Sequence, residues 1–103
     1  MIRAPDHLPT LHKDSYVGVA NRLTKDIPNA HTFDQFGNLD NPKTHYEETA
    51  EEIWNQCDGR LDYVFAGAGT GGTISGISRK LKEKNPNIKI IGIDPEGSLV
   101  AQP

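Results

Sequence analysis

Residues 61–93 read LDYVFAGAGTGGTISGISRKLKEKNPNIKIIGI. Their pattern predicts four consecutive elements: a strand over 61–66, a glycine-rich turn over 67–72, an amphipathic helix over 73–84 and a buried strand over 88–93. A strand, a helix and a second strand in this order are typical of a parallel sheet with crossover helices. The stretch therefore predicts the fold class α/β, with this unit as one part of a doubly wound parallel sheet.

Two shorter elements are expected in the first third of the chain. Apolar residues that recur on one helical face predict a helix over 14–25, with Asp14 or Ser15 as its N-cap. A short strand is expected over 30–33, followed by a polar loop.

A further helical stretch is expected before the strand at 61–66. Pro42 behind Asn41 fits the first position of a helix, because proline lacks the N–H group that is unpaired there. Thr49 and Glu52 match a capping box, which predicts a helix that starts at Thr49 and runs to about Cys57.

Length and charge exclude several classes of protein. The chain has 103 residues, with 11 Lys and Arg against 14 Asp and Glu, so its formal net charge is −3. This length allows one small domain at most, and the mild acidity argues against partners such as nucleic acid or an anionic membrane. No apolar stretch approaches the roughly 20 residues of a membrane span.

The metal-ligating residue types give no pattern. Cys57 is the only cysteine, and the four histidines are not paired at helical spacing, so no metal site is expected. A single cysteine also excludes a disulfide framework, and a cytoplasmic setting is the expectation that follows.

The glycine-rich turn carries the clearest chemical signal. A helix N-terminus presents unpaired N–H groups and a partial positive charge, which together bind phosphate. Glycines let the backbone approach such an anion, and Thr70 and Thr73 add hydroxyl donors. Four glycines in six residues exceed what close packing of a helix on a strand requires. The turn therefore predicts a phosphate site.

The spacing leaves open which phosphate compound binds. Gly67, Gly69 and Gly72 satisfy the pattern G-x-G-x-x-G, and Asp94 lies 22 residues after Gly72 at the end of the next strand. This matches a dinucleotide-binding template, including its acidic ribose partner. A phosphate monoester such as pyridoxal phosphate fits equally well, since the two threonine hydroxyls suit the oxygens of a terminal phosphate.

A resemblance to a known family favours the second ligand. Residues 66–76 resemble the phosphate-binding loop of fold-type II pyridoxal phosphate enzymes, the cysteine synthase and cystathionine β-synthase family. Residues 34–36, 41–42 and 45–46 (Asp-Gln-Phe, Asn-Pro and His-Tyr) resemble the segment that precedes this loop in the family. Similarity to the cystathionine β-synthase branch extends to two further stretches, Ser-Tyr-Val-Gly-Val-Ala at 15–20 and Gly-Ile-Asp-Pro-Glu-Gly-Ser at 92–98.

The resemblance implies roles for individual residues. Five residues would wrap the phosphate of pyridoxal 5'-phosphate: Gly69, Thr70, Gly71, Gly72 and Thr73. Gln35 stands where the family has a glutamine that binds the substrate α-carboxylate, and Phe36 stands where a tyrosine is often found. Asp94 would then cap or turn the chain before Pro95. No catalytic residue is assigned, because no lysine lies in a context that matches the family's Schiff-base lysine.

The implied activity is that of a larger enzyme of which this chain would be an internal fragment. Residues 1–37 would be the end of its smaller domain, and residues 38–103 part of the larger cofactor-binding domain. The implied reaction is replacement of the β-hydroxyl of serine by homocysteine, a lyase reaction of transsulfuration and cysteine biosynthesis, in a cytoplasmic homo-oligomer. The fragment is expected to be inactive alone. Two alternatives stay open, a cysteine synthase of the same family and a dinucleotide-binding Rossmann half-domain.

Overall fold

The computed structural model describes residues 1–5 and 7–98. The chain divides into two compact units, Met1–Asp34 and Gln35–Pro103, and each is described by itself. This division falls close to the domain boundary expected after residue 37. The assignment of the two parts to a smaller and a larger domain stays a prediction. The last five residues of the expected larger domain, 99–103, lie outside the described residues.

The first unit is built around helix α1 (Tyr16–Asp26), which confirms the helix expected over 14–25. Of the two candidate caps, Ser15 is the one used. Its hydroxyl accepts a hydrogen bond from the N–H of Gly18 at 3.1 Å and donates one to the carbonyl oxygen of Thr10 at 2.8 Å. The side chain of Ser15 is fully buried, so both bonds satisfy a polar group that water cannot reach.

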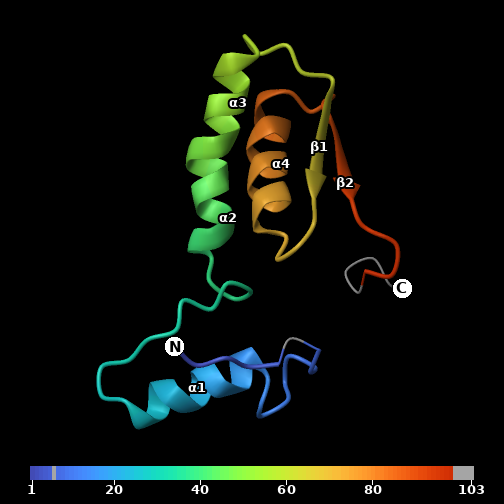
Figure 1. Ribbon diagram of the computed structural model, residues 1–103. Coiled ribbons are helices and arrows are strands. Elements are labelled where there is room, and N and C mark those ends of the chain that lie inside the picture. The colour runs from blue at the N-terminus through green and yellow to red at the C-terminus, as the bar shows by residue number, and fades with distance from the viewer. Residues whose placement is uncertain (6, 99–103) are drawn as a thin grey trace. The chain divides into compact units, whose positions relative to one another are not determined.

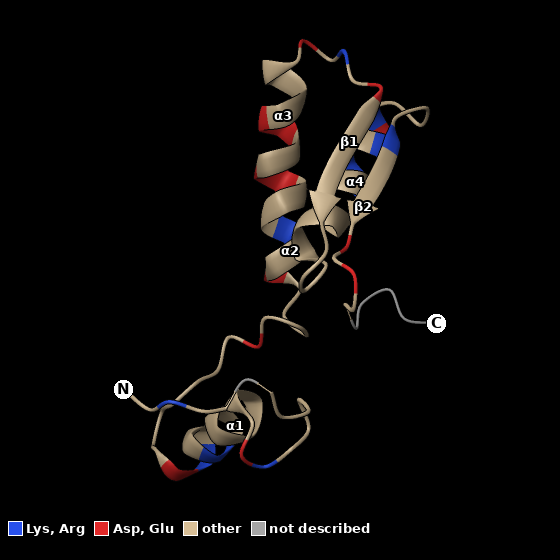
Figure 2. Ribbon diagram, turned by 45° about the vertical axis from the view of Figure 1, so that its right-hand side comes forward, with Lys and Arg blue, Asp and Glu red and all other residues tan. Residues whose placement is uncertain are grey.

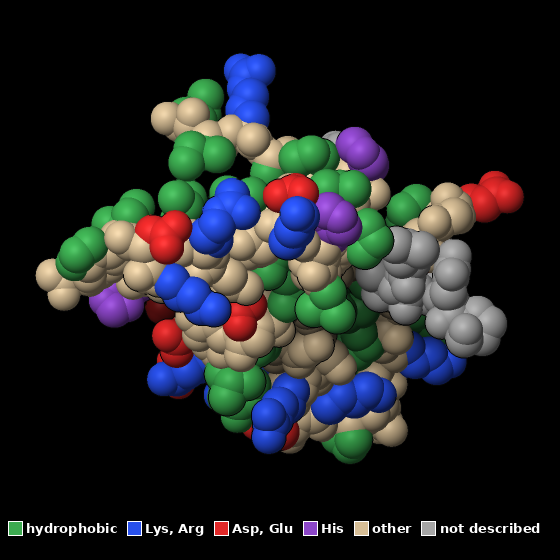
Figure 3. Space-filling model, turned by 90° about the horizontal axis from the view of Figure 1, so that it is seen from below, with side chains coloured by type: hydrophobic (Ala, Val, Ile, Leu, Met, Phe, Trp, Pro, Cys, Tyr) green, Lys and Arg blue, Asp and Glu red, His purple; other side chains and the backbone are tan. Residues whose placement is uncertain are grey.

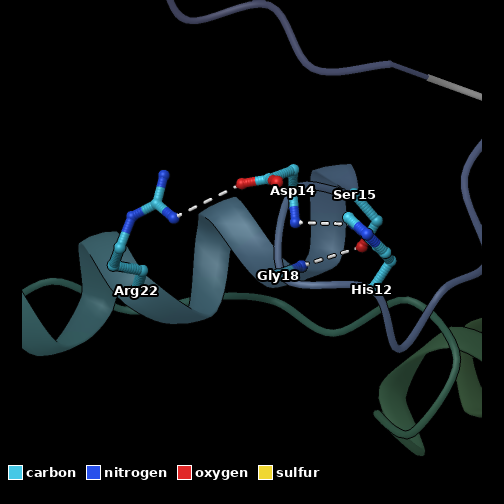
Figure 4. A network of polar contacts seen from close by, with 5 residues as sticks. All are labelled: His12, Asp14, Ser15, Gly18 and Arg22. Atoms are coloured by element: carbon cyan, nitrogen blue, oxygen red, sulfur yellow. Dashed lines mark hydrogen bonds and ion pairs between the residues drawn. The ribbon is translucent and has the colours of Figure 1, made fainter.

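The start of α1 is tied together by further polar contacts (Figure 4). The N–H of Asp14 donates to His12 Nδ1 at 3.1 Å, and the carboxylate of Asp14 lies 4.0 Å from Arg22. A Cβ atom at Gly18 would overlap the backbone of His12 and Lys13, so only glycine permits this tight approach.

The strand expected over 30–33 is wrong. Residues 30–34 have no regular secondary structure, and the N–H of Ala30 instead closes a turn by donating to the carbonyl oxygen of Ile27 at 3.2 Å. A strand requires a neighbour for its hydrogen bonds. Among the described residues the only strands are β1 and β2, and they pair with each other.

The second unit opens with a continuous helical rod. It consists of α2 (Asp40–Thr44), the π-helical segment η1 (His45–Thr49) and α3 (Ala50–Gln56). Pro42 is the third helical residue and not the first, a position that still lies in the turn whose N–H groups have no partner within the helix. We refer to these three segments together as the rod.

The capping box expected at Thr49 is wrong. Thr49 has helical dihedral angles (φ −56°, ψ −43°) because the helix already began nine residues earlier at Asp40. Its hydroxyl does not cap α3 and lies 3.0 Å from His45 Nδ1. In η1 the N–H of Ala50 donates to the carbonyl oxygen of His45, which gives the wider turn of a π-helix.

The predicted strand–helix–strand unit is confirmed. Strand β1 (Tyr63–Gly67) pairs in parallel with β2 (Lys89–Ile93), in a register that places Tyr63 opposite Lys89 and Gly67 opposite Ile93. Helix α4 (Gly72–Lys84) connects them and lies between the rod and the two strands (Figure 1). The fold is therefore α/β with a small parallel sheet.

The core of this unit lies between α4, the rod and one face of the sheet. Four hydrophobic side chains are buried there: Ala50, Ile77, Leu81 and Ile88. Trp54, Val64 and Ile90 pack against them. Gly76 lies where α4 meets the rod, and a Cβ at this position would overlap the carbonyl oxygen of Pro42. Glycine at 76 therefore sets how closely the two helices approach.

Charged side chains join α3 to α4. Acidic positions recur along the rod (Figure 2), and among them Glu51 of α3 lies 3.3 Å from Lys80 Nζ and 2.8 Å from Lys84 Nζ. The hydrogen bond from Lys84 is the main cause that holds the pKa of Glu51 below its ordinary value. On the face seen in Figure 3, basic, acidic and hydrophobic side chains are interspersed.

Among the described residues, no helix is long and apolar enough to cross a membrane. Within the same part of the chain, no three His, Cys, Asp or Glu side chains lie close enough together to hold a metal ion.

Candidate phosphate site at the start of helix α4

The backbone of the glycine-rich turn forms a helix N-terminus whose N-cap residue makes no side-chain cap hydrogen bond. The N-cap residue of α4 is Gly71, whose φ of 84° lies in the left-handed region. An L-residue would be strained there, so glycine is required for the chain to enter the helix in this way. The first helical bond is made by the N–H of Ser75 to the carbonyl oxygen of Gly71 at 3.0 Å. The N–H groups of Thr73 and Ile74 come before this bond, in the part of a helix where N–H groups have no partner within the helix and can bind phosphate.

The glycines of the turn differ in their surroundings. A Cβ at Gly72 would overlap the side chain of Asn41, so this glycine serves the packing of the rod on the turn. A Cβ at Gly69 would meet no described atom within 4 Å. Packing within the described chain therefore does not require a glycine at 69, and the open space beside it fits a bound ligand.

The hydroxyl of Thr70 is held by two donors. Asn41 Nδ2 lies 2.9 Å from Thr70 Oγ1, and the N–H of Gly72 donates to the same oxygen at 3.3 Å. Asn41 Nδ2 also donates to the carbonyl oxygen of Gln35 at 2.9 Å. One side chain of α2 thus ties together the turn and the segment that carries Gln35.

The hydroxyl of Thr73 meets the rod one turn further along. Thr73 Oγ1 lies 3.1 Å from His45 Nε2, while His45 Nδ1 contacts Thr49 Oγ1. Both Thr70 and Thr73 are exposed residues. The site therefore presents two anchored hydroxyl groups beside a helix N-terminus.

A cavity of about 110 Å³ brings the expected substrate residue to the expected cofactor loop. Its wall contains Gln35 and Phe36 on one side and Thr70, Gly71 and Gly72 on the other. Positions 35 and 70 are thus neighbours in space, as the resemblance implies for a carboxylate site beside a phosphate site.

Asp94 does not form, with any described residue, the side-chain cap that was one of its two expected roles. Both of its carboxylate oxygens are buried, and neither has a hydrogen-bond partner in the part of the chain that the structure describes. The expected capping bond before Pro95 is therefore absent from the described residues. Asp94 directly follows β2. Since Gly67 at the end of β1 is paired with Ile93 at the end of β2, Asp94 lies at the same edge of the sheet as the start of the glycine-rich turn.

Two residues of the site, Asn41 and His45, were given no role at the phosphate turn in the sequence analysis. Asn41 contacts Thr70 and His45 contacts Thr73, both threonines of the turn. The sequence signal for these two residues was that Asn-Pro at 41–42 and His-Tyr at 45–46 resemble the segment that precedes the turn in the family.

Comparison with known proteins identifies the family. The sequence profile described as "Pyridoxal-phosphate dependent enzyme" matches residues 10–102. The chain belongs to this family. The assignment decides between the two phosphate ligands that the spacing left open, in favour of pyridoxal phosphate, and the turn fits its phosphate through the open space at Gly69 and the hydroxyls of the two exposed threonines.

Two curated relatives of the chain are a cystathionine beta-synthase and a cysteine synthase. The chain is 57% identical to cystathionine beta-synthase from Mus musculus over 103 residues, which is all of this chain and 18% of that protein. It is 47% identical to cysteine synthase 3 from Caenorhabditis elegans over 78 residues, 76% of this chain and 23% of that protein. The chain thus spans about a fifth of the length of these curated relatives.

A solved structure supports the fold. The O-acetylserine dependent cystathionine beta-synthase from Helicobacter pylori superposes with a TM-score of 0.74 and 41% sequence identity. The superposition covers 78% of this chain and 26% of that protein. That structure is a fold-type II enzyme, and the matched part of this chain shares its α/β fold.

Proposed function

We propose that this chain is the phosphate-binding part of a cystathionine β-synthase-like enzyme that replaces the β-hydroxyl of serine by homocysteine. The proposal rests on the family and on identity to cystathionine beta-synthase over the whole chain. The single observation that carries it is the cavity in which Gln35 and the glycine-rich turn meet. Serine, homocysteine, a cytoplasmic setting, homo-oligomeric assembly and the two-domain division after residue 37 belong to the same proposal.

In this proposal the turn holds the cofactor and Gln35 holds the substrate. Residues 69–73 bind the phosphate through the N-terminus of α4 and the hydroxyls of Thr70 and Thr73. The Gln35 side-chain amide donates to the α-carboxylate of the amino acid. Pyridoxal phosphate, when bound, supplies the electron sink for cleavage at the β-carbon.

We propose further that the chain alone is inactive, because none of its lysines lies in a context that matches the family's Schiff-base lysine. The lysines of the second unit contact other groups: Lys43 contacts Glu47, Lys80 and Lys84 contact Glu51, Lys82 contacts the carbonyl oxygen of Pro86, and Lys89 contacts Tyr63. In this proposal the amine that transfers the substrate proton belongs to a lysine outside this chain.

The test uses the full-length polypeptide that carries this sequence. It is expected to bind pyridoxal phosphate and to form cystathionine from serine and homocysteine, whereas the 103-residue chain alone forms none. Gln35→Glu, a change of nearly equal size, should raise KM for serine by at least about tenfold, since a second carboxylate repels the substrate. It should leave the affinity for pyridoxal phosphate within about twofold.

Three outcomes would contradict parts of this proposal. Turnover by the isolated chain refutes the proposal of inactivity. An unchanged KM for serine in the Gln35→Glu variant refutes the role of Gln35. Preference for sulfide over homocysteine as the second substrate would identify a cysteine synthase, the alternative that the Caenorhabditis elegans relative supports.

A further inference from the structure

The two threonine hydroxyls of the turn are each contacted by a side chain of the rod. Asn41 reaches Thr70 and His45 reaches Thr73, across 29 and 28 positions of sequence. A hydroxyl group has one proton to donate and two lone pairs that accept. The partners of each hydroxyl therefore decide whether its proton is available to a ligand.

Thr70 has both of its lone pairs occupied. One accepts the hydrogen bond from Asn41 Nδ2 and the other accepts from the N–H of Gly72. The orientation of the Asn41 amide is determined by Gln35, because a carbonyl oxygen can only accept and the atom beside it must be the NH₂ group. The hydroxyl can thus form its third bond only as a donor, and its proton points away from the network.

The tautomer of His45 decides which group donates in the hydrogen bond between His45 and Thr73. A neutral imidazole carries a proton on one nitrogen and a lone pair on the other, so His45 donates to one of its two threonines and accepts from the other. If Nε2 carries the proton, His45 donates to Thr73 and the Thr73 hydroxyl keeps its proton for a ligand. If Nδ1 carries it, Thr73 must donate to His45 and can only accept elsewhere.

The chemistry of phosphate selects between these two directions. The terminal oxygens of a phosphate monoester are strong acceptors and carry most of its charge near neutral pH. They require donors, and a charged acceptor makes each such bond stronger than one between neutral groups. The Thr73 hydroxyl can donate its proton to phosphate only if His45 Nε2 is protonated and donates to Thr73.

We propose that Asn41 and His45 are positioning residues that direct the hydroxyl protons of Thr70 and Thr73 toward the bound phosphate. The proposal rests on the proposed function, since it takes the phosphate of the cofactor as the ligand. In the loaded protein His45 is the tautomer with its proton on Nε2, and Thr49 donates to Nδ1.

Affinity measurements on the full-length polypeptide test the proposal. We expect His45→Phe and Thr73→Val each to weaken binding of pyridoxal phosphate and of inorganic phosphate by roughly 10- to 100-fold, the scale of one hydrogen bond to a charged group. The double variant should be no weaker than Thr73→Val alone, because His45 acts through that hydroxyl. His45→Gln should restore most of the affinity, since its amide can donate where Nε2 does.

A matched control separates positioning from simple packing of the rod on α4. Tyr46 is the neighbour of His45 in the rod, and its hydroxyl donates to Glu83 Oε2 of α4 at 2.6 Å, away from the turn. Tyr46→Phe should leave phosphate affinity unchanged. Equal losses in Tyr46→Phe and His45→Phe, or additive losses in the double variant, overturn the proposal.

Nitrogen NMR of the wild-type protein gives an independent readout. Spectra of ¹⁵N-labelled histidine distinguish the two tautomers, and the loaded protein should show His45 with a protonated Nε2. An unprotonated Nε2 with phosphate bound refutes the proposal and leaves the proposed function standing. Failure of the wild-type protein to bind either phosphate compound refutes both.

Discussion

Replacement of Gly76 by alanine tests the contact that brings the rod to α4. Gly76 lies in the interior of a helix, where alanine is intrinsically more favourable by about 1 kcal/mol. The added Cβ, however, would overlap the carbonyl oxygen of Pro42 and would lie 2.8 Å from both His45 Cβ and the nitrogen of Tyr46. Two of these three atoms belong to the backbone, and the Pro42 oxygen already accepts from the N–H of His45.

The overlap outweighs the gain in helix propensity. Overpacking against a rigid neighbour costs about 1–3 kcal/mol and sometimes more. Because two backbone atoms would have to move, we expect a cost at the upper end of this range, about 3 kcal/mol, so that after the propensity gain Gly76→Ala lowers the free energy of unfolding by about 2 kcal/mol. Urea unfolding slopes of small proteins are about 1–3 kcal/mol per molar, so the midpoint should fall by roughly 0.7–2 M.

The fluorescence of Trp54 reports this transition. It is the only tryptophan of the chain and packs against the core that α4 and the rod share. Gly69→Ala serves as the matched control, because its Cβ meets no described atom, and it should leave the midpoint unchanged while it weakens phosphate binding. A Gly76→Ala chain as stable as the wild type, or more stable, refutes the close-approach argument.

Two further predictions concern Tyr46 and Asp94. The hydrogen bond to Glu83 is the main cause that raises the pKa of Tyr46 above its model-compound value of 10.0. This bond therefore stabilises the fold below pH 10 and is lost as the pH rises through the higher folded pKa, and Glu83→Gln should lower the pKa of Tyr46 in a titration of tyrosine absorbance. Asp94→Ala should leave the affinity for pyridoxal phosphate nearly unchanged in a binding titration, whereas a dinucleotide-binding site that used Asp94 for ribose would lose NAD binding.

The local signals in the sequence were sufficient for the strand–helix–strand unit. Its alternating and helical periodicities, together with the glycines between them, describe neighbours along the chain, and both strands and α4 lie within two residues of the expected bounds. The same reasoning failed at 30–33, where apolar residues resemble a strand but no partner strand is present among the described residues. Strand formation depends on a neighbour that the segment itself does not reveal.

The error at Thr49 has a related cause. Its pattern with Glu52 is a genuine local preference, but a cap forms only where the preceding residues are not helical. The helix that starts at Asp40 continues through η1 and takes Thr49 into its interior. The hydroxyl then contacts His45, a role that a pattern of four residues does not predict.

Asn41 and His45 were missed because their partners are distant in sequence. Helical periodicity shows which residues share a face, but it does not show which residues of another helix that face will meet. The contacts to Thr70 and Thr73 depend on how closely the rod approaches α4, and glycines at 72 and 76 determine that distance.

The four glycines of residues 69–76 therefore act for three separate physical reasons, although together they form one motif. Gly71 provides a left-handed φ, and Gly72 and Gly76 provide close approach of the rod. Gly69 leaves open space that no described atom fills. If this division is correct, alanine at 76 should lower stability, and it should also weaken phosphate binding by displacing His45 from Thr73. Alanine at 69 should weaken phosphate binding and leave stability unchanged. The two substitutions therefore separate the effect on binding from the effect on stability.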